Sequence, residues 1–210
     1  MQKNESTTSR PDLRLKILEK AVSLFKEKGI KSVRMDDIAQ SLAISKRTLY
    51  EEYANKEQLL LEVIIREHER RKKELNEFSL KAENVMQLVV MVLRQKIHEL
   101  GVVSPLFYSE LSRYKPVKEY LTATFEENRQ QSMAFFLKGV ESGFFRKDVS
   151  YDIFSLLTDA QLSYVMNTRM YEQFPLKDIF ETFVNVQLRG ICTEKGRRIL
   201  DRSYAENGSL

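Results

Sequence analysis

The chain has 210 residues, 42% of them hydrophobic and 30% charged, with a net charge of +4, which suits one large or two small domains around a buried core. Its seven glycines and four prolines are too few for the many tight turns of a sandwich, a barrel or a doubly wound sheet. The longest apolar run, residues 88–93, is far below the roughly 20 residues of a membrane span, and the polar first 14 residues lack the apolar stretch of a secretory signal. Because Cys192 is the one cysteine, we expect a protein of the reducing cytoplasm. Because the apolar runs are short, we expect no contact with the membrane.

The first 55 residues are predicted to form three helices. Asp12 can cap a helix with apolar residues every three or four positions, and Gly29 can end it in a left-handed conformation. A short second helix follows around residues 38–42. Ser45 is a good N-cap for a third helix that reaches Tyr53, and Asn55 can cap the next one.

Six further helices are predicted from apolar periodicity, at residues 56–78, 84–100, 104–113, 116–141, 150–171 and 175–192. No segment alternates with the period of a strand, and there is no internal repeat. The polar residues after 193 favour a frayed end or a short extra helix. We therefore predict an all-α fold of about nine helices, with a three-helix head (residues 1–55), a larger helical domain (56–193) and a polar C-terminal tail (194–210).

The most informative stretch is residues 33–56, VRMDDIAQSLAISKRTLYEEYANK. Two short helices joined by a tight turn are typical of a helix-turn-helix, whose second helix enters the major groove of DNA. Five apolar residues can form the small core of such a unit: Ile38, Ala39, Leu42, Ile44 and Leu49. Tyr53 is interpreted as a further core aromatic.

The polar residues of this stretch suit contacts with DNA. Cations, hydroxyls and helix N-terminal N–H groups bind phosphates and base edges. The predicted DNA-contacting residues are Arg34, Lys46, Arg47, Thr48, Tyr50 and Lys56. Residues 1–56 carry twelve Lys and Arg against eight Asp and Glu, whereas residues 57–210 carry twenty-two of each, so all the excess charge lies here. A solvated face is the alternative interpretation of these cations.

This part of the sequence resembles the TetR family of transcriptional regulators. The resemblance covers roughly 50 residues and is carried by Ala21, Leu24, Phe25, Gly29, Asp37-Ile38-Ala39, Leu42, Ile44-Ser45, Thr48-Leu49-Tyr50, Tyr53 and Lys56-Glu57-x-Leu59. It implies a homodimeric repressor that binds a palindromic double-stranded operator and is released by a small molecule. It also implies that the fourth to seventh helices enclose the ligand and that the eighth and ninth pair with a second subunit.

The sequence departs from the family pattern at four places. The usual glycine of the turn is Ala43, which must tolerate a Cβ with a small strain. The usual capping threonine is Arg34, which cannot cap through its side chain, and Asp36 would repel phosphate if it faced DNA. Glu51 and Glu52 replace aromatic or histidine residues, so the base preference of relatives cannot be transferred.

The segment expected to enclose a ligand is rich in Phe, Tyr and Met, with seventeen of the chain's twenty-eight such residues between Met86 and Met170. Such side chains suit an apolar pocket, and we expect a mainly hydrophobic effector. The predicted pocket residues are Met86, Val90, Phe107, Leu111, Leu121, Phe125, Arg129 and Tyr164. Arg129 leaves an anionic ligand open, and each of these residues can instead belong to an ordinary core.

The last two predicted helices are the expected dimer interface. The eighth is apolar nearly all round, so it must be buried on more than one side. The predicted interface residues are Ile153, Leu157, Leu176, Phe180, Phe183 and Val184. The alternative is that both are internal helices of one subunit.

The sequence offers no set of groups for catalysis or metal binding. His68 and Glu69 do not complete a zinc signature, because position 72 is a lysine. With two histidines and one cysteine, neither a metal site nor a Cys–His nucleophile is expected, and we predict no cofactor and no enzyme activity. The alternative function is a ligand-blind DNA-binding adaptor whose C-terminal domain recruits another protein. A ligand cavity would favour the sensor and a closed core the adaptor.

Overall fold

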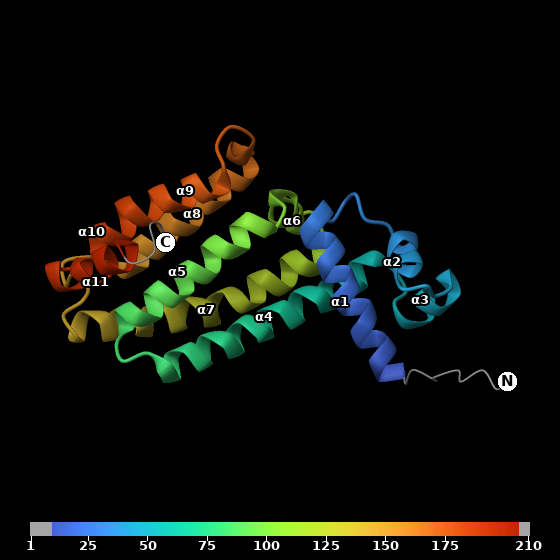
Figure 1. Cartoon of the computed structure of the whole chain (residues 1–210), viewed down its shortest axis with the longest axis horizontal. Helices are drawn as coiled ribbons and strands as arrows, with labels where there is room; N and C mark the ends of the chain where they lie inside the picture. Colours follow the sequence, from blue (N-terminus) through green and yellow to red (C-terminus); the bar gives the residue numbers. More distant parts are fainter. Residues whose placement is uncertain (1–9, 206–210) are drawn as a thin grey trace. The chain divides into compact units, whose positions relative to one another are not determined.

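The computed structural model describes residues 10–205, and in this range the fold is all-α, as predicted (Figure 1). The elements are α1 (Arg10–Lys28), α2 (Met35–Ser41), α3 (Lys46–Glu52), α4 (Lys56–Lys81), α5 (Val85–Val102), α6 (Pro105–Leu111), α7 (Lys115–Glu141), α8 (Tyr151–Asn167), the 3-10 turn η1 (Met170–Glu172), α9 (Leu176–Phe183), the π-helical η2 (Val184–Leu188), α10 (Arg189–Ile191) and α11 (Glu194–Ala205). Outside these helices, one isolated antiparallel bridge joins Phe145 and Cys192. Among the described residues, no helix is long and apolar enough to cross a membrane.

The chain divides into two compact units, which differ from the predicted domains. Unit 1 contains the residues up to Glu69 together with Leu106–Tyr120, and unit 2 contains Arg70–Pro105 together with the residues from Leu121 onward. The predicted cut after residue 55 misses that the first half of α4, α6 from Leu106 onward and the start of α7 belong with the head. The reason is tertiary, since α6 packs on the loop that follows α1.

Two glycines end helices in the left-handed conformation, which the sequence predicted for Gly29. Gly29 has φ +81° and donates its N–H to the carbonyl of Phe25 at 3.0 Å. Gly143 has φ +73° and donates to Val140 at 3.0 Å, while Phe144 donates to Gly139 at 2.9 Å, which is a Schellman motif at the end of α7. Both chain reversals are therefore set by local backbone geometry.

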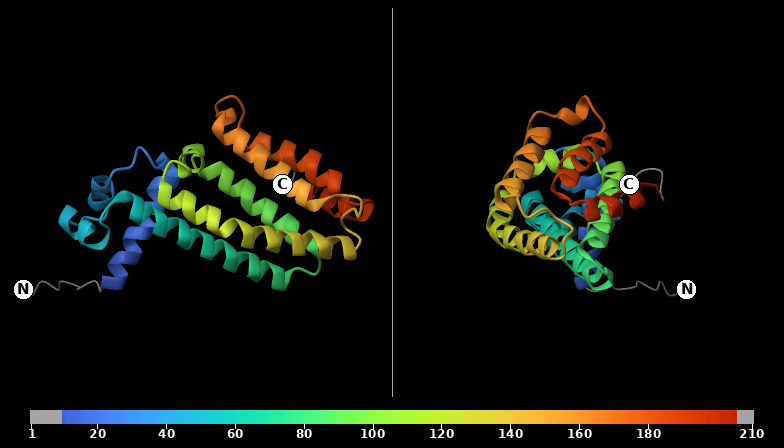
Figure 2. Two further views of the ribbon diagram at one scale, coloured as in Figure 1. Left: turned by 180° about the vertical axis from the view of Figure 1, so that it is seen from behind. Right: turned by 90° about the vertical axis from the view of Figure 1, so that its left-hand side faces the viewer.

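The core of unit 2 is built around α5. Met86 on α5 is fully buried, and α9 and α11 both pack against this helix. The rings of Phe136 and Tyr151 stack with centroids 4.7 Å apart, and Phe145 lies beside both. The left view of Figure 2 draws the C-terminal helices α8 to α11 above α5.

The C-terminal residues form the short extra helix that the sequence left open, α11, and this helix is docked on the core. In α11, Leu200 is fully buried and Ile199 packs against the unit 2 core. Most residues of α11 are polar, but one narrow apolar face is enough to hold a short helix on a core. The remainder of the predicted tail, residues 206–210, lies outside the described residues. Just before α11, burial raises the pKa of the Cys192 thiol to about 11.

Candidate nucleic-acid interface

Helices α2 and α3 form the predicted helix-turn-helix. The turn between them is closed by the N–H of Ala43, which donates to Gln40 at 3.1 Å, and by the N–H of Ile44, which donates to Ala39 at 3.1 Å. Ala43 has φ +53°, a left-handed conformation that costs a non-glycine residue roughly 1–2 kcal/mol. The strain expected at Ala43 is therefore present.

The N-termini of both helices are capped by neighbouring side chains. The Ser45 hydroxyl accepts a hydrogen bond from the N–H of Thr48 at 3.0 Å, as predicted for α3. Arg34 occupies the N-cap position of α2 without a side-chain cap, and the Asp37 carboxylate accepts from its N–H at 2.7 Å. The Asp37 carboxylate therefore partly replaces the helix cap that the missing threonine would provide. Helix α2 begins at Met35.

A small apolar core holds the two helices in place. Ile38, Ala39 and Leu49 are buried, whereas Leu42 and Ile44 are half-buried. Tyr53 is fully buried, which confirms its interpretation as a core residue, and the Arg14 guanidinium lies 4.5 Å from its ring centroid. This packing orients α3 from behind and leaves its other side to solvent.

The exposed side of α3 carries most of the residues that the sequence assigned to DNA. Lys46, Arg47 and Tyr50 are exposed, and Arg34 is exposed at the start of α2. Thr48 is half-buried, with its hydroxyl 2.8 Å from that of Ser45. One solvent-facing surface thus combines these cations and the Tyr50 phenol with the backbone of a short helix.

Both cations of α3 are paired with carboxylates of the same unit. The Lys46 ammonium pairs with Asp36 of α2, and the Arg47 Nε donates to Glu51 at 2.9 Å. Glu52 points elsewhere and accepts from Arg10 at 2.8 Å. Exposed pairs of this kind contribute about 0–1 kcal/mol, so DNA phosphates can compete for these cations.

Lys56 is placed differently from the predicted phosphate ligand. Its ammonium donates to the carbonyls of Ile30 and Val33, both at 3.0 Å, and lies 5.9 Å from the Tyr114 ring centroid. Burial lowers the pKa of Lys56, partly offset by the Glu110 carboxylate. In this conformation the half-buried Lys56 ties the start of α4 to the loop after α1, and its role as a phosphate ligand stays a prediction.

Glu110 is a residue that sequence reasoning missed. It is buried on α6, and its carboxylate accepts from the N–H of Lys31 at 2.7 Å. A Cβ on Gly29 would lie 2.7 Å from the Cβ of Leu106, so the glycine allows α6 to approach the loop closely. This contact fixes the loop that leads into α2, and no local signal could have revealed it because its partners are 79 positions apart.

The predicted pocket residues are divided between the two units and differ in exposure. Met86 and Val90 are buried in the unit 2 core, whereas Phe107 and Leu111 belong to unit 1. The remaining apolar members are exposed: Leu121, Phe125 and Tyr164. Arg129 pairs with Asp152 at 2.7 Å. The assignment of the eight residues to one enclosed site stays a prediction.

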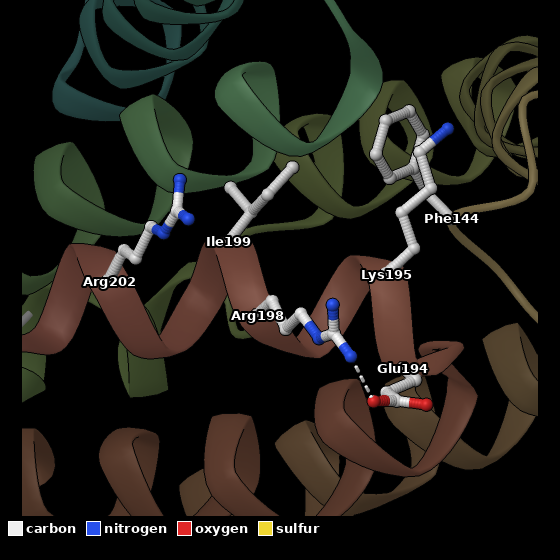
Figure 3. A pocket seen from close by; sticks show the side chains of 6 residues that line it. All are labelled: Phe144, Glu194, Lys195, Arg198, Ile199 and Arg202. Carbon is white, nitrogen blue, oxygen red and sulfur yellow. Dashed lines mark hydrogen bonds and ion pairs between the residues drawn. The ribbon is translucent and has the colours of Figure 1, made fainter.

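A hollow of about 450 Å³ lies elsewhere, on the surface of α11 (Figure 3). Its lining residues are Phe144, Glu194, Lys195, Arg198, Ile199 and Arg202. The Lys195 ammonium lies 4.1 Å from the Phe144 ring centroid, and Arg198 pairs with Glu194.

Among the described residues, no cluster of three or more His, Cys, Asp or Glu could hold a metal ion.

The predicted dimer residues divide into an exposed and a buried set. Leu176 and Val184 are buried within the subunit, where they cannot meet a second copy, and this corrects their assignment. Phe180 and Phe183 are half-buried and pack against the unit 2 core. On α8, one face is apolar and exposed, with Ile153 at 59%, Leu156 at 58%, Leu157 at 56% and Tyr164 at 63%.

This arrangement defines the class of protein, one with a helix-turn-helix of the kind that DNA-binding proteins place in the major groove. Residues 17–63 match the sequence model of the bacterial regulatory proteins of the tetR family. The N-terminal part of the chain, which contains the helix-turn-helix, is therefore similar to that of the TetR-family regulators.

Individual relatives agree with this assignment over part of their length. The biofilm operon icaADBC HTH-type negative transcriptional regulator IcaR of Staphylococcus epidermidis is 46% identical over 44 residues, which cover 21% of this chain and 24% of IcaR. The HTH-type transcriptional regulator UidR of Escherichia coli K12 is 39% identical over 70 residues, which cover 33% of this chain and 35% of UidR. The chain thus matches about a quarter to a third of the length of these relatives, both of which are named as transcriptional regulators.

The similarity of fold extends over nearly the whole chain. A transcriptional regulator from Saccharomonospora viridis, solved in complex with choline, matches with a TM-score of 0.69 over 88% of this chain and 100% of that one, at 17% identity. At this identity the comparison supports the fold alone.

Proposed function

We propose that this protein is a DNA-binding transcriptional repressor that acts as a homodimer on a two-fold operator. The observation that carries the proposal is the geometry of α3. Its buried side is fixed by Leu49 on the head core, and its opposite side presents Lys46, Arg47 and Tyr50 to solvent. This is the arrangement a recognition helix needs to reach base edges and phosphates in the major groove.

The homodimer is supported by the exposed face of α8. Ile153, Leu156, Leu157 and Tyr164 recur at helical spacing on one side of this helix, and all four are more than half exposed. A contiguous apolar surface of this kind marks an interaction site. A second copy is the fitting partner, because helix-turn-helix dimers read two half-sites roughly 34–36 Å apart and need a self-complementary interface.

We also propose that a small molecule of low polarity releases the protein from DNA. Unit 2 exposes apolar side chains on α5, α7 and α8 that its own core leaves uncovered: Val92, Leu121, Phe125 and Leu162. A ligand can act only by binding better to the conformation that does not bind DNA. The choline bound to the neighbour from Saccharomonospora viridis supports a ligand-binding use of this fold, while leaving the chemistry of the ligand to be tested.

The DNA-binding proposal is tested by replacing both cations of α3. Duplexes enriched from a random library by the wild-type protein serve as the operator probe. We expect Lys46→Ala with Arg47→Ala to weaken binding of this probe while the melting temperature stays near that of the wild type, since both side chains are exposed. Each lost phosphate contact should flatten the dependence of log K on log salt by about 0.9.

The control removes the same charge outside the helix-turn-helix. Lys28→Ala with Lys115→Ala changes two exposed lysines of unit 1 and should bind the probe nearly as well as the wild type. If the wild type enriches no sequence, or if the α3 variant binds across a salt series as the wild type does, the protein does not read DNA with α3.

The effector proposal is tested by thermal shift and by release of the enriched duplex. One compound set contains lipophilic molecules, and the other contains choline and charged, hydrophilic metabolites. We expect stabilisation and release within the lipophilic set. Release by the hydrophilic set alone would contradict the proposal, and release by neither would favour a ligand-blind adaptor.

A further inference from the structure

The Lys46–Asp36 ion pair connects the two helices of the helix-turn-helix. Lys46 is on α3 and Asp36 is on α2, ten positions earlier, and both side chains are exposed at the surface. The Arg47–Glu51 pair repeats the arrangement within α3. Both cations of α3 that were assigned to DNA are thus paired with carboxylates of the helix-turn-helix.

We propose that Asp36 is a positioning residue that restrains Lys46 from binding phosphates, and so makes Lys46 discriminate between DNA sequences. This inference rests on the proposed function. An ammonium group has three donors, and the bond to Asp36 leaves two for a base edge or a phosphate. To follow the phosphate backbone of an arbitrary duplex, the ammonium must leave Asp36.

The physical basis is that binding to arbitrary DNA and binding to a matching site depend on different interactions. Binding to arbitrary DNA is almost entirely electrostatic, so a carboxylate that occupies a cation and repels phosphates weakens it directly. Binding to a matching site adds base contacts, which an ammonium held in place by Asp36 can make without leaving its partner. Asp36 therefore lowers affinity for random DNA more than affinity for a matching site.

The test compares Asp36→Asn with the wild type on two fluorescent probes, a random-sequence duplex and the duplexes enriched by the wild type. We expect the variant to bind the random duplex about fivefold more tightly. The slope of log K against log salt should steepen by about 0.9 for each head, because Lys46 gains a phosphate contact. Affinity for the enriched duplexes should rise less or fall, so the ratio between the two probes decreases.

Three further variants separate this role from simple charge or folding effects. In a Lys46→Ala background, Asp36→Asn should change the affinity and the slope far less, because most of its effect acts through Lys46 and only the direct repulsion between carboxylate and phosphate remains. Asp36→Glu keeps the carboxylate and should retain most of the wild-type discrimination. Glu27→Gln removes an equal charge from an exposed position on α1 and should change neither quantity appreciably.

The proposal is overturned if Asp36→Asn leaves the affinity for random duplex and the salt slope unchanged, or if Glu27→Gln reproduces its effect. It is also overturned if the Asp36→Asn effect persists in full without Lys46. Loss of binding to the enriched duplexes alone would mean that Asp36 contacts a base itself. Failure of the proposed function is recognised separately, because the wild type would then enrich no sequence at all, and the role of Asp36 would fail with it.

Discussion

Replacing Leu157 by aspartate is expected to convert the protein from a dimer into monomers and to weaken binding of a two-fold duplex by about a hundredfold or more. Leu157 lies in the middle of the exposed face of α8, between Ile153 and Tyr164. A carboxylate there would have to be desolvated in the interface, opposite its own symmetry mate. Linked heads bind two half-sites with an advantage of about 10²–10⁴ over one, and monomers lose it.

Sedimentation at micromolar concentration measures the first effect, and anisotropy with a two-fold duplex measures the second. Leu80→Asp is the control, because Leu80 on α4 is 88% exposed and lies outside α8 and α9. It should remain dimeric. A wild type that sediments as a monomer, or a Leu157→Asp variant that sediments as a dimer, would show that this face of α8 is not the interface.

Helix boundaries could be predicted because the chemistry that sets them acts within a few residues. Ser45, Asn55 and Ser150 were each predicted to start a helix, and each accepts a hydrogen bond from the N–H three positions later, at 3.0, 2.9 and 3.5 Å. The predicted helix over 175–192 is present as an uninterrupted run from Leu176 to Ile191, although its middle turn is π-helical. Capping and periodicity are local properties that a single sequence displays.

The roles of residues with distant partners could not be predicted in the same way. Lys56 fits the family pattern as a phosphate ligand, yet its hydrogen-bond acceptors are 26 and 23 positions away on the loop after α1. Leu176 and Val184 belong to a periodic apolar pattern, which shows that a helix is buried without showing whether its own subunit or a partner covers it. The exposed cations of α3 were predicted, but their pairing with Asp36 and Glu51 required the structure.

The second large effect is a loss of stability that we expect from a substitution at Gly139, which packs closely against Phe145. A Cβ on Gly139, within α7, would lie 2.0 Å from the Cδ2 atom of Phe145 and 2.4 Å from its Cε2 atom. The Phe145 ring cannot withdraw easily, because Phe135, Phe136 and Tyr151 surround it with centroids 5.8–6.4 Å away. One methyl group therefore has no room without movement of the unit 2 core.

We expect Gly139→Ala to lower the free energy of unfolding by about 2 kcal/mol or more, because overpacking outweighs the roughly 1 kcal/mol that alanine contributes to a helix. The melting temperature should fall by about 4–8 °C for a chain of this size. Gly101→Ala on α5 is the matched control, since its Cβ would meet nothing within 4 Å, and it should raise the free energy of unfolding by up to about 1 kcal/mol. Urea unfolding of both variants measures the opposite changes that we expect in the free energy of unfolding. A Gly139→Ala protein as stable as the wild type would mean that the Phe145 ring is not confined by its neighbours.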